Sequence, residues 1–229
     1  MSTRSLRPFT LPRRQSGFTL VEIAIVLVII GLLLGGVLKG QEMIDNAKVK
    51  KAVADMNGIS SAYNSYVDRF RRIPGDDGPT LAALTGRAGS WASVTANGNA
   101  DGILTATAAD TFLAATAENL GFWQHLKAAG FISGNPADLG TSALPGNAFN
   151  GLIGVFNNTT ALTGAPTGIV VCLGSIPGKA ARQIDTQLDD GIANTGSVRA
   201  TQGAANAIPG NAVGAAYSDA QTYTVCRSL

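Results

Sequence analysis

The feature that most constrains this chain is an apolar run from Phe18 to Leu38, close to the start of the sequence. The run contains 21 residues, and Glu22 is the one charged residue among them. At about 1.5 Å of rise per residue, an α-helix of this length extends about 31 Å, which matches a bilayer hydrocarbon core of about 30 Å. We therefore predict that residues 18–38 form a membrane-spanning helix.

The residues before this run differ from an ordinary secretory signal. Residues 1–17 contain no acidic residue and four arginines, namely Arg4, Arg7, Arg13 and Arg14. The positive-inside tendency therefore keeps this leader in the cytoplasm and sends the C-terminal part of the chain outward. A secretory signal is cleaved after its apolar region, whereas here the small residue Gly17 precedes it. Cleavage at Gly17 would remove the charged leader and leave the helix on the mature chain.

The sequence around Gly17 reads Arg13-Arg14-Gln15-Ser16-Gly17-Phe18-Thr19-Leu20-Val21-Glu22. It resembles the type III signal of type IV pilins and type II secretion pseudopilins. The resemblance implies that a prepilin peptidase cuts after Gly17 and methylates the new amine on Phe18. It also implies a filament subunit that joins other copies or related pilins at an inner-membrane assembly platform.

Glu22 has two interpretations. A charge at the bilayer centre costs roughly 2.5–3.5 kcal/mol on insertion scales, and less near a helix end. In the first interpretation, Thr19 and Glu22 form a capping box that satisfies N–H groups at the start of the helix. In the second, which the resemblance implies, Glu22 of one subunit pairs with the cationic amine on Phe18 of a neighbour. The spacing of these residues fits both.

Glycines recur in the same helix at spacings that suit close packing between helices. Gly31 and Gly35 form one pair with three residues between them, and Gly36 and Gly40 form another. Such pairs let helix backbones approach each other, although glycine is also simply common in membrane helices. Many members of the pilin family carry a proline where this chain has Lys39, so the glycines are the residues that would loosen this part of the helix.

The rest of the chain has the composition of an exported, loop-rich domain. Without residues 1–17 it contains 13 Lys and Arg residues against 15 Asp and Glu residues, a net charge of −2. This balance gives no indication of nucleic-acid binding through bulk charge. About 190 residues follow the membrane helix, which is enough for one domain with its own core.

The hydrophobic pattern predicts an α+β, pilin-like fold. Apolar residues at intervals of three to four continue the first helix through residues 39–73, as an amphipathic half that ends before Pro74 and Gly75. Residues 74–229 then form a globular head with a small antiparallel sheet, a long glycine-rich insertion and a short extra helix. The predicted helices are Asp110–Ala129, stopped by Gly130, and Ile176–Leu188, and the predicted strands are Gly151–Phe156, Thr167–Leu173 and Tyr223–Arg227.

Two loops of the head have polar residues that could hold a cation. Asn97, Asn99 and Asp101, followed by Gly102, imitate the start of a calcium loop, but the position of the bidentate glutamate is occupied by Ala108. Asp185, Asp189 and Asp190 form an acidic cluster before a glycine, in a segment that also resembles pseudopilins and minor pilins. We expect a glycine-rich turn and a solvated turn, with no cofactor; a bound Ca²⁺ is the alternative.

Three other residue types were candidates for chemistry. Cys172 and Cys226 are the two cysteines of the chain, and in an exported protein they predict one disulfide, which the resemblance to pilins also implies. A metal or redox pair is disfavoured because there is no C-x-x-C motif. Trp91 is expected to be a packing anchor, and His125, the one histidine, a surface or packing residue.

The sequence contains no recognisable catalytic motif. Because it has a single histidine, it cannot use most of the histidine-based mechanisms that require two histidines. We therefore expect a structural protein: a pilin, minor pilin or pseudopilin of a type IV pilus or type II secretion filament. It would span the bacterial inner membrane once before assembly and then enter a periplasmic or cell-surface filament. The alternative is a membrane-anchored adhesion or binding domain that uses a pilin-type signal for export and does not polymerise.

Overall fold

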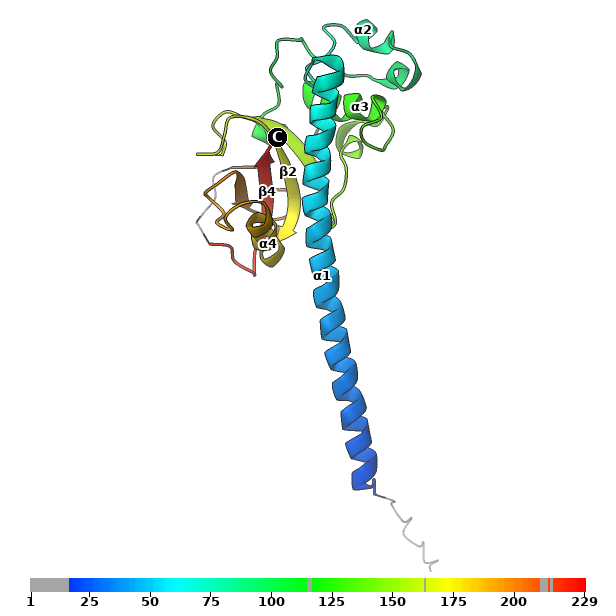
Figure 1. The fold of residues 1–229 in the computed structure, drawn as a ribbon, viewed down its shortest axis with the longest axis vertical. Helices are drawn as coiled ribbons and strands as arrows, with labels where there is room; N and C mark the ends of the chain where they lie inside the picture. The colour runs from blue at the N-terminus through cyan, green and yellow to red at the C-terminus, as the bar shows by residue number, and fades with distance from the viewer. Residues whose placement is uncertain (1–16, 115–116, 163, 211–213, 215) are drawn as a thin grey trace, which may run out of the picture. The chain divides into compact units, whose positions relative to one another are not determined.

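The structure is a computed structural model that describes residues 17–114, 117–162, 164–210, 214 and 216–229; the charged leader before Gly17 lies outside these residues. The helices are α1 (Leu20–Phe70), α2 (Leu81–Thr85), α3 (Ala117–Ala128) and α4 (Gly178–Leu188). The strands are β1 (Ile153–Asn158), β2 (Gly168–Pro177), β3 (Val198–Gln202) and β4 (Thr222–Ser228) (Figure 1). Short 3₁₀ turns lie at Gly89–Ser93, Ala108–Asp110 and Gly140–Ala143. The fold is α+β, as the sequence predicts.

The chain divides into two compact units between Ile44 and Asp45. In the N-terminal unit, α1 begins at Leu20, and its residues as far as Ile44 are exposed apart from Gly40, which is half-buried. By length and composition, the helix is long and apolar enough to cross a membrane. The predicted apolar helix is therefore present, and it has no core of its own within the chain.

The second unit, from Asp45 onward, is called the head below. There, α1 buries one face at intervals of three or four residues, through Val49, Ala52, Met56, Ile59, Ala62 and Tyr66. This is the amphipathic pattern that the sequence predicts. The helix ends at Phe70, slightly before the predicted end, because Arg71 adopts a left-handed backbone with φ of 54° and Pro74 follows.

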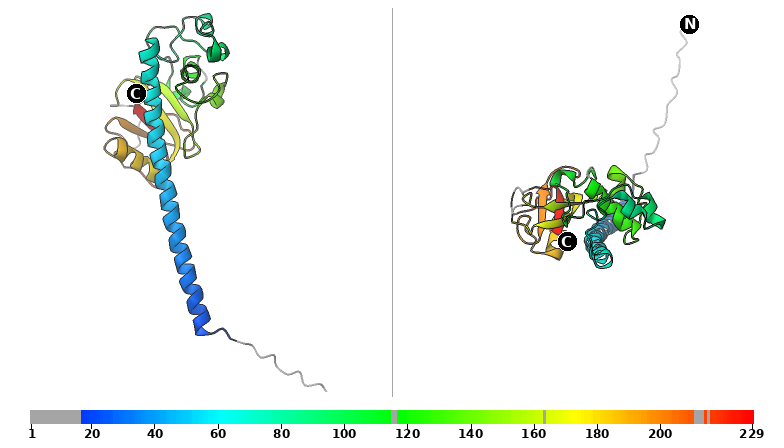
Figure 2. Two further views of the ribbon diagram at one scale, coloured as in Figure 1. Left: turned by 45° about the vertical axis from the view of Figure 1, so that its right-hand side comes forward. Right: turned by 90° about the horizontal axis from the view of Figure 1, so that it is seen from above.

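Four antiparallel strands form the sheet of the head, in the order β1-β2-β4-β3. The sheet lies beside the part of α1 that belongs to the head (Figure 2). The guanidinium of Arg227 on β4 donates a hydrogen bond to Asn57 Oδ1 on that helix, at 2.6 Å. Val171 and Val225, which lie on the same face of the sheet as Arg227, are fully buried. One face of the sheet therefore packs toward the helix.

The opposite face of the sheet is covered by loops rather than by a second layer of helices. A Cβ atom on Gly154 would meet the backbone of Thr111, and one on Gly174 would meet the side chain of Asn206. Thr224 Oγ1 donates to the carbonyl of Ala207 at 2.7 Å. Glycine and a small hydroxyl on this face thus allow the loops to lie directly on the sheet.

Cys172 and Cys226 form a disulfide on this loop-covered face. They are directly opposite each other on β2 and β4, the two central strands, and both side chains are buried. The two cysteine-bearing strands therefore lie at the centre of the sheet, with β1 and β3 at its edges.

Several predicted boundaries also need correction. The helix predicted from Asp110 begins at Ala117, because Asp110 instead closes a 3₁₀ turn by accepting hydrogen bonds from the N–H and hydroxyl of Thr107. Leu113, which lies within the range predicted for that helix, is therefore outside it and exposed. Ile176 and Pro177 belong to β2, and α4 starts at Gly178. Strand β3 and the short helices within residues 74–109 were not predicted.

The disulfide generates a stability prediction. Replacing Cys226 with serine opens a covalent loop whose ends are 54 residues apart, which costs about 4 kcal/mol in the chain-entropy model. We expect a lower thermal midpoint for the full chain in detergent micelles, measured by near-ultraviolet circular dichroism, and faster proteolysis after Cys172. The Cys172→Ser control should lower the thermal midpoint by as much, since it removes the same bond. Two free thiols in folded protein exported under oxidising conditions would contradict the assignment.

Candidate functional site at the N-terminal motif

The start of α1 is organised by a reciprocal pair of side chains, Thr19 and Glu22. The N–H and the hydroxyl of Thr19 both donate to Glu22 Oε2, at 2.9 and 3.0 Å, and the N–H of Glu22 donates to Thr19 Oγ1 at 3.2 Å. This is a capping box, which satisfies N–H groups that the first turn of a helix leaves without partners. The first interpretation of Glu22 is thus realised within a single chain.

The capping box does not use the whole carboxylate. Both of its hydrogen bonds to Glu22 end on Oε2. An ionised carboxylate has two oxygens and about four acceptor positions. The geometry of one chain is therefore compatible with a further donor at Glu22, which the second interpretation requires.

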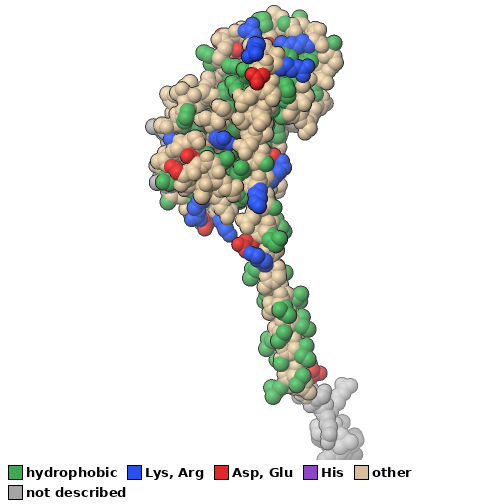
Figure 3. All heavy atoms as spheres, viewed as in Figure 1, with side chains coloured by type: hydrophobic (Ala, Val, Ile, Leu, Met, Phe, Trp, Pro, Cys, Tyr) green, Lys and Arg blue, Asp and Glu red, His purple; other side chains and the backbone are tan. Residues whose placement is uncertain are grey.

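The apolar side chains that follow the motif are open to solvent. Phe18 is 84% exposed and Leu20 is 91% exposed, and the exposed apolar residues continue along the helix to Leu38 and beyond (Figure 3). Fully burying one side chain of this kind stabilises by roughly 1.5–3 kcal/mol. A helix that exposes so many of them requires lipid or other apolar surfaces around it.

The glycines of this helix have no packing role inside the chain. A Cβ atom added to Gly31, Gly35, Gly36 or Gly40 would meet no described atom within 4 Å, beyond the neighbouring turns of the helix itself. Helix propensity alone disfavours glycine by about 1 kcal/mol relative to alanine. Their spacing is therefore best suited to contacts outside the single chain.

The loop that imitates a calcium site is organised by a residue that the sequence did not single out, Asp76. Its carboxylate is buried and accepts the N–H of Asp101 at 3.1 Å and the N–H of Gly102 at 2.8 Å. Asp101 in turn accepts from the side-chain amide of Asn99 at 2.9 Å, and the amide of Asn97 donates to a backbone carbonyl at 3.1 Å. The polar residues of this loop hold its own backbone.

The acidic cluster has a comparable structural role between α4 and β3. One carboxylate oxygen from each of Asp185, Asp189 and Asp190 lies within 4.8 Å of the others. Asp189 accepts the N–H of Val198 at 3.0 Å, at the first residue of β3. The cluster therefore fixes the turn that delivers this edge strand.

Asp185 is the buried member of the cluster. It accepts a hydrogen bond from the hydroxyl of Tyr217 at 2.6 Å and one from the N–H of Gly191 at 3.2 Å. Burial raises the pKa of Asp185, and the charges of the two neighbouring aspartates add to that effect. Tyr217 was not predicted, because it is distant in sequence and no motif marks it.

Comparison with known protein families bears on the N-terminal motif. Residues 12–38 match the prokaryotic N-terminal methylation motif, the signature of type IV pilin and pseudopilin signals. The chain carries a prepilin-type signal. The resemblance deduced from residues 13–22 is confirmed, and the matched span ends at Leu38, where the predicted membrane helix ends. Among curated proteins, none matches the chain.

The prepilin-type signal implies processing by a prepilin peptidase and assembly with other pilins. Of the residues assigned to it, Gly17 and Phe18 precede the helix, and Thr19 and Glu22 form the cap. A Cβ atom added to Gly17 would meet no described atom within 4 Å.

This geometry generates a processing prediction. Mass spectrometry of the exported chain should give a mature form that begins at Phe18 and carries a methyl group on its amine. Gly17→Val should leave the precursor uncut and retained in the membrane, because a branched side chain takes the place of the smallest residue. Gly31→Val is the matched control and should be cut normally. A natural mature N-terminus after Leu38 would contradict the assignment.

Proposed function

We propose that this chain is a subunit of a type IV pilus or type II secretion filament, assembled through residues 18–38 after cleavage at Gly17. The observation that carries the proposal is the prepilin-type signal on a helix whose apolar side chains are exposed. Before assembly the helix spans the inner membrane once, with the head outside the cytoplasm. The motif implies a structural protein rather than an enzyme, and the proposed role needs no cofactor.

Assembly exchanges one apolar environment for another. In the membrane, lipid surrounds the exposed side chains of α1, and in the filament the same helix of other subunits would replace that lipid. The small-residue spacings at Gly31 and Gly35 would let neighbouring helix backbones approach each other. The core of the head begins at Val49, so this exchange does not require the head to refold.

Glu22 would set the register between subunits. Cleavage at Gly17 creates a cationic amine on Phe18, and an apolar filament core makes an unpaired charge costly. An amine from an incoming subunit that reaches the carboxylate of Glu22 would neutralise both charges. The capping box contacts end on Oε2 and so leave acceptor positions for that amine.

Three variants separate the charge of Glu22 from its capping role. Glu22→Gln retains a capping-box residue and removes the charge, whereas Thr19→Ala removes the cap partner and retains the charge. Glu22→Ala removes both functions. We expect all three to insert in the membrane, and we expect Glu22→Gln and Glu22→Ala to reduce filaments at least tenfold when each is the sole copy, counted by electron microscopy.

Thr19→Ala is the matched control in this series. It should cost about 1 kcal/mol of local helix stability and should leave most filaments in place, because the carboxylate is still present. Normal filament numbers in Glu22→Gln, together with loss in Thr19→Ala, would assign Glu22 to capping alone. If the unmutated chain forms no filaments, the result would instead support the alternative, a membrane-anchored binding domain.

A further inference from the structure

His125 is held in the head by two backbone groups that fix its protonation. It lies on α3 and is fully buried, and not at the surface, which was one of the two placements that the sequence allowed. Its Nδ1 accepts the N–H of Gly75 at 3.0 Å, and its Nε2 lies 3.0 Å from the carbonyl oxygen of Ala96. A backbone N–H group can only donate and a carbonyl oxygen can only accept, so the ring is neutral with its proton on Nε2.

The turn that donates to Nδ1 cannot yield by a small movement. Gly75 has φ of +92°, and a Cβ atom there would meet the carbonyl of Glu118 on α3 and the side chain of Leu104. Pro74, Gly75, Asp76, Asp77 and Gly78 are all buried. A proton on Nδ1 would point a second donor at the N–H of Gly75, and the tightly packed turn would have to leave the ring.

Several ionisable groups surround the ring, and each has another partner. Asp77 accepts a hydrogen bond from Tyr66 Oη at 2.7 Å and forms an ion pair with Arg87 at 2.8 Å. Although burial opposes it, the hydrogen bonds from Arg87 and Tyr66 lower the pKa of Asp77. On α3, the carboxylate of Glu118 accepts the N–H of Thr105, and Lys127 pairs with Asp138 at 3.0 Å. Asp76 binds the amides of the neighbouring loop.

A charged imidazole would thus have no carboxylate of its own among the described residues. The rings of Tyr66 and Trp91 pack beside it, with centroids 6.3 and 5.8 Å away. Trp91 is buried, as the sequence predicted for a packing anchor. Burial lowers the pKa of His125 to about 4, and the hydrogen bond to Ala96 and the charge of Asp77 oppose the shift less strongly.

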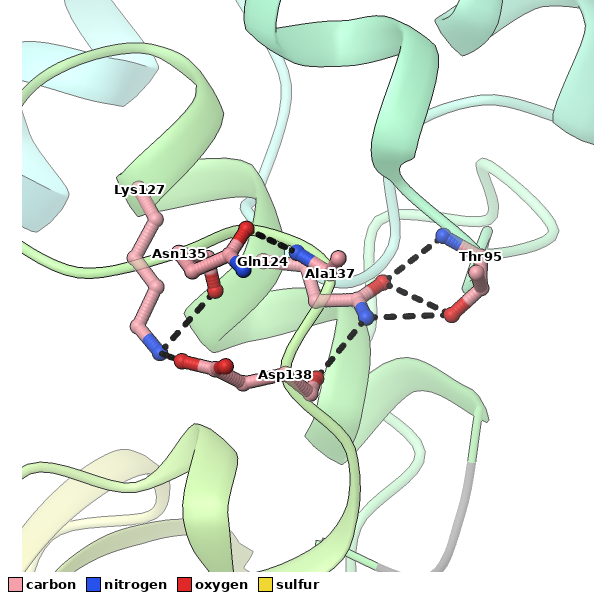
Figure 4. A network of polar contacts seen from close by, with 6 residues as sticks. All are labelled: Thr95, Gln124, Lys127, Asn135, Ala137 and Asp138. Atoms are coloured by element: carbon pink, nitrogen blue, oxygen red, sulfur yellow. Dashed lines mark hydrogen bonds and ion pairs between the residues drawn. The ribbon is translucent and has the colours of Figure 1, made fainter.

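A neighbouring side chain holds the same region without any titratable group. Gln124 Oε1 accepts the N–H of Thr95 at 2.9 Å, and its Nε2 donates to the carbonyl of Asp138 at 3.1 Å (Figure 4). Gln124 Oε1 also accepts the N–H of Ala96 at 3.0 Å. These bonds are independent of pH in the range where histidine titrates. Two consecutive residues of α3 therefore respond differently to pH: the contacts of Gln124 do not change, whereas protonation breaks the contact between His125 and Gly75.

We propose that His125 is an acid-sensitive latch of the head. Protonation of Nδ1 releases the turn at residues 74–78 from α3, together with the loop at 97–102 that Asp76 holds. Gln124 keeps residues 95–96 in place, and the disulfide-linked sheet stays folded. The released segment uncovers the side chain of Tyr66, whose hydroxyl donates to Asp77 in that turn.

The direction of the pH effect follows from the two protonation states. The ordinary pKa of a histidine is 6.5, and that of latched His125 is lower, so the released form binds the proton more tightly. Above pH 6.5 the imidazole is neutral in both forms, and the closed form keeps its full stability. This stability is lost as pH falls through about 4, the pKa of His125 in the closed form. Between these limits the opening equilibrium changes about tenfold per pH unit, or about 300-fold in total.

Hydrogen exchange of the full chain in detergent micelles tests the latch directly. Between pH 7 and pH 4, after correction for intrinsic exchange rates, peptides covering 74–78 and 97–102 should lose protection. Peptides from β2 and β4 should keep theirs. Loss of protection in the turn and the sheet together would mean global unfolding, and unchanged protection of the turn at pH 4 would equally overturn the latch.

Two variants make the test specific. His125→Asn places an oxygen acceptor where Nδ1 lies and cannot titrate in this range, so the turn should lose its pH dependence even if it is less protected throughout. Gln124→Ala is the matched control: it should loosen residues 95–96 at every pH and leave the pH dependence of the turn intact. A persisting pH dependence in His125→Asn would contradict the proposal.

His125 is the one histidine of the sequence, so its ring can be titrated without assignment in an untagged, labelled natural chain by nuclear magnetic resonance. A midpoint well below 6.5 that coincides with release of the turn supports the latch. A midpoint near 6.5 while the turn stays protected would overturn it, even if His125→Asn does not fold.

Discussion

The exposed apolar surface of residues 18–38, most of it on α1, is the constraint on which the rest of the structure depends. Each of its large side chains would gain roughly 1.5–3 kcal/mol from full burial, and the described part of the chain leaves them exposed. The helix must therefore lie in lipid or against other helices. The head does not need lipid or other helices for its own burial, because its core is built from residues from Val49 onward. Under the proposed function, such a chain moves from a membrane to a filament without rebuilding its folded domain.

Within the head, covalent and polar links supplement the hydrophobic core. One face of the sheet packs toward α1, and the other is covered by loops that bond to small or polar side chains such as Thr224. The disulfide joins the two central strands beneath those loops. Helix α3 holds the insertion through the amide of Gln124 and the ring of His125. The loop-rich composition of the head is compatible with a fixed structure because its backbone groups find such partners.

The sequence predicted the parts of this structure that rest on periodicity or on covalent chemistry. Both halves of α1 follow from apolar spacing, and the cysteine pair follows from export. Strand β3 could not be found in this way, because Val-Arg-Ala-Thr-Gln is short and its start is fixed by Asp189 from the preceding turn. The helix at Asp110 was predicted too early because Thr107 caps a 3₁₀ turn there. Asp76 and Tyr217 act through partners distant in sequence, which local patterns do not reveal.

Immunoelectron microscopy of intact cells and sheared surface material, with an antibody against residues 74–160 of the head, tests the central claim most directly. The account predicts that the antibody labels filaments, and that the labelled material contains the chain beginning at Phe18. Label along the whole filament would identify a major subunit, and label confined to an end would identify a minor one. Label restricted to the cell envelope, with no filament carrying the chain, would contradict the claim that this helix is built for polymerisation.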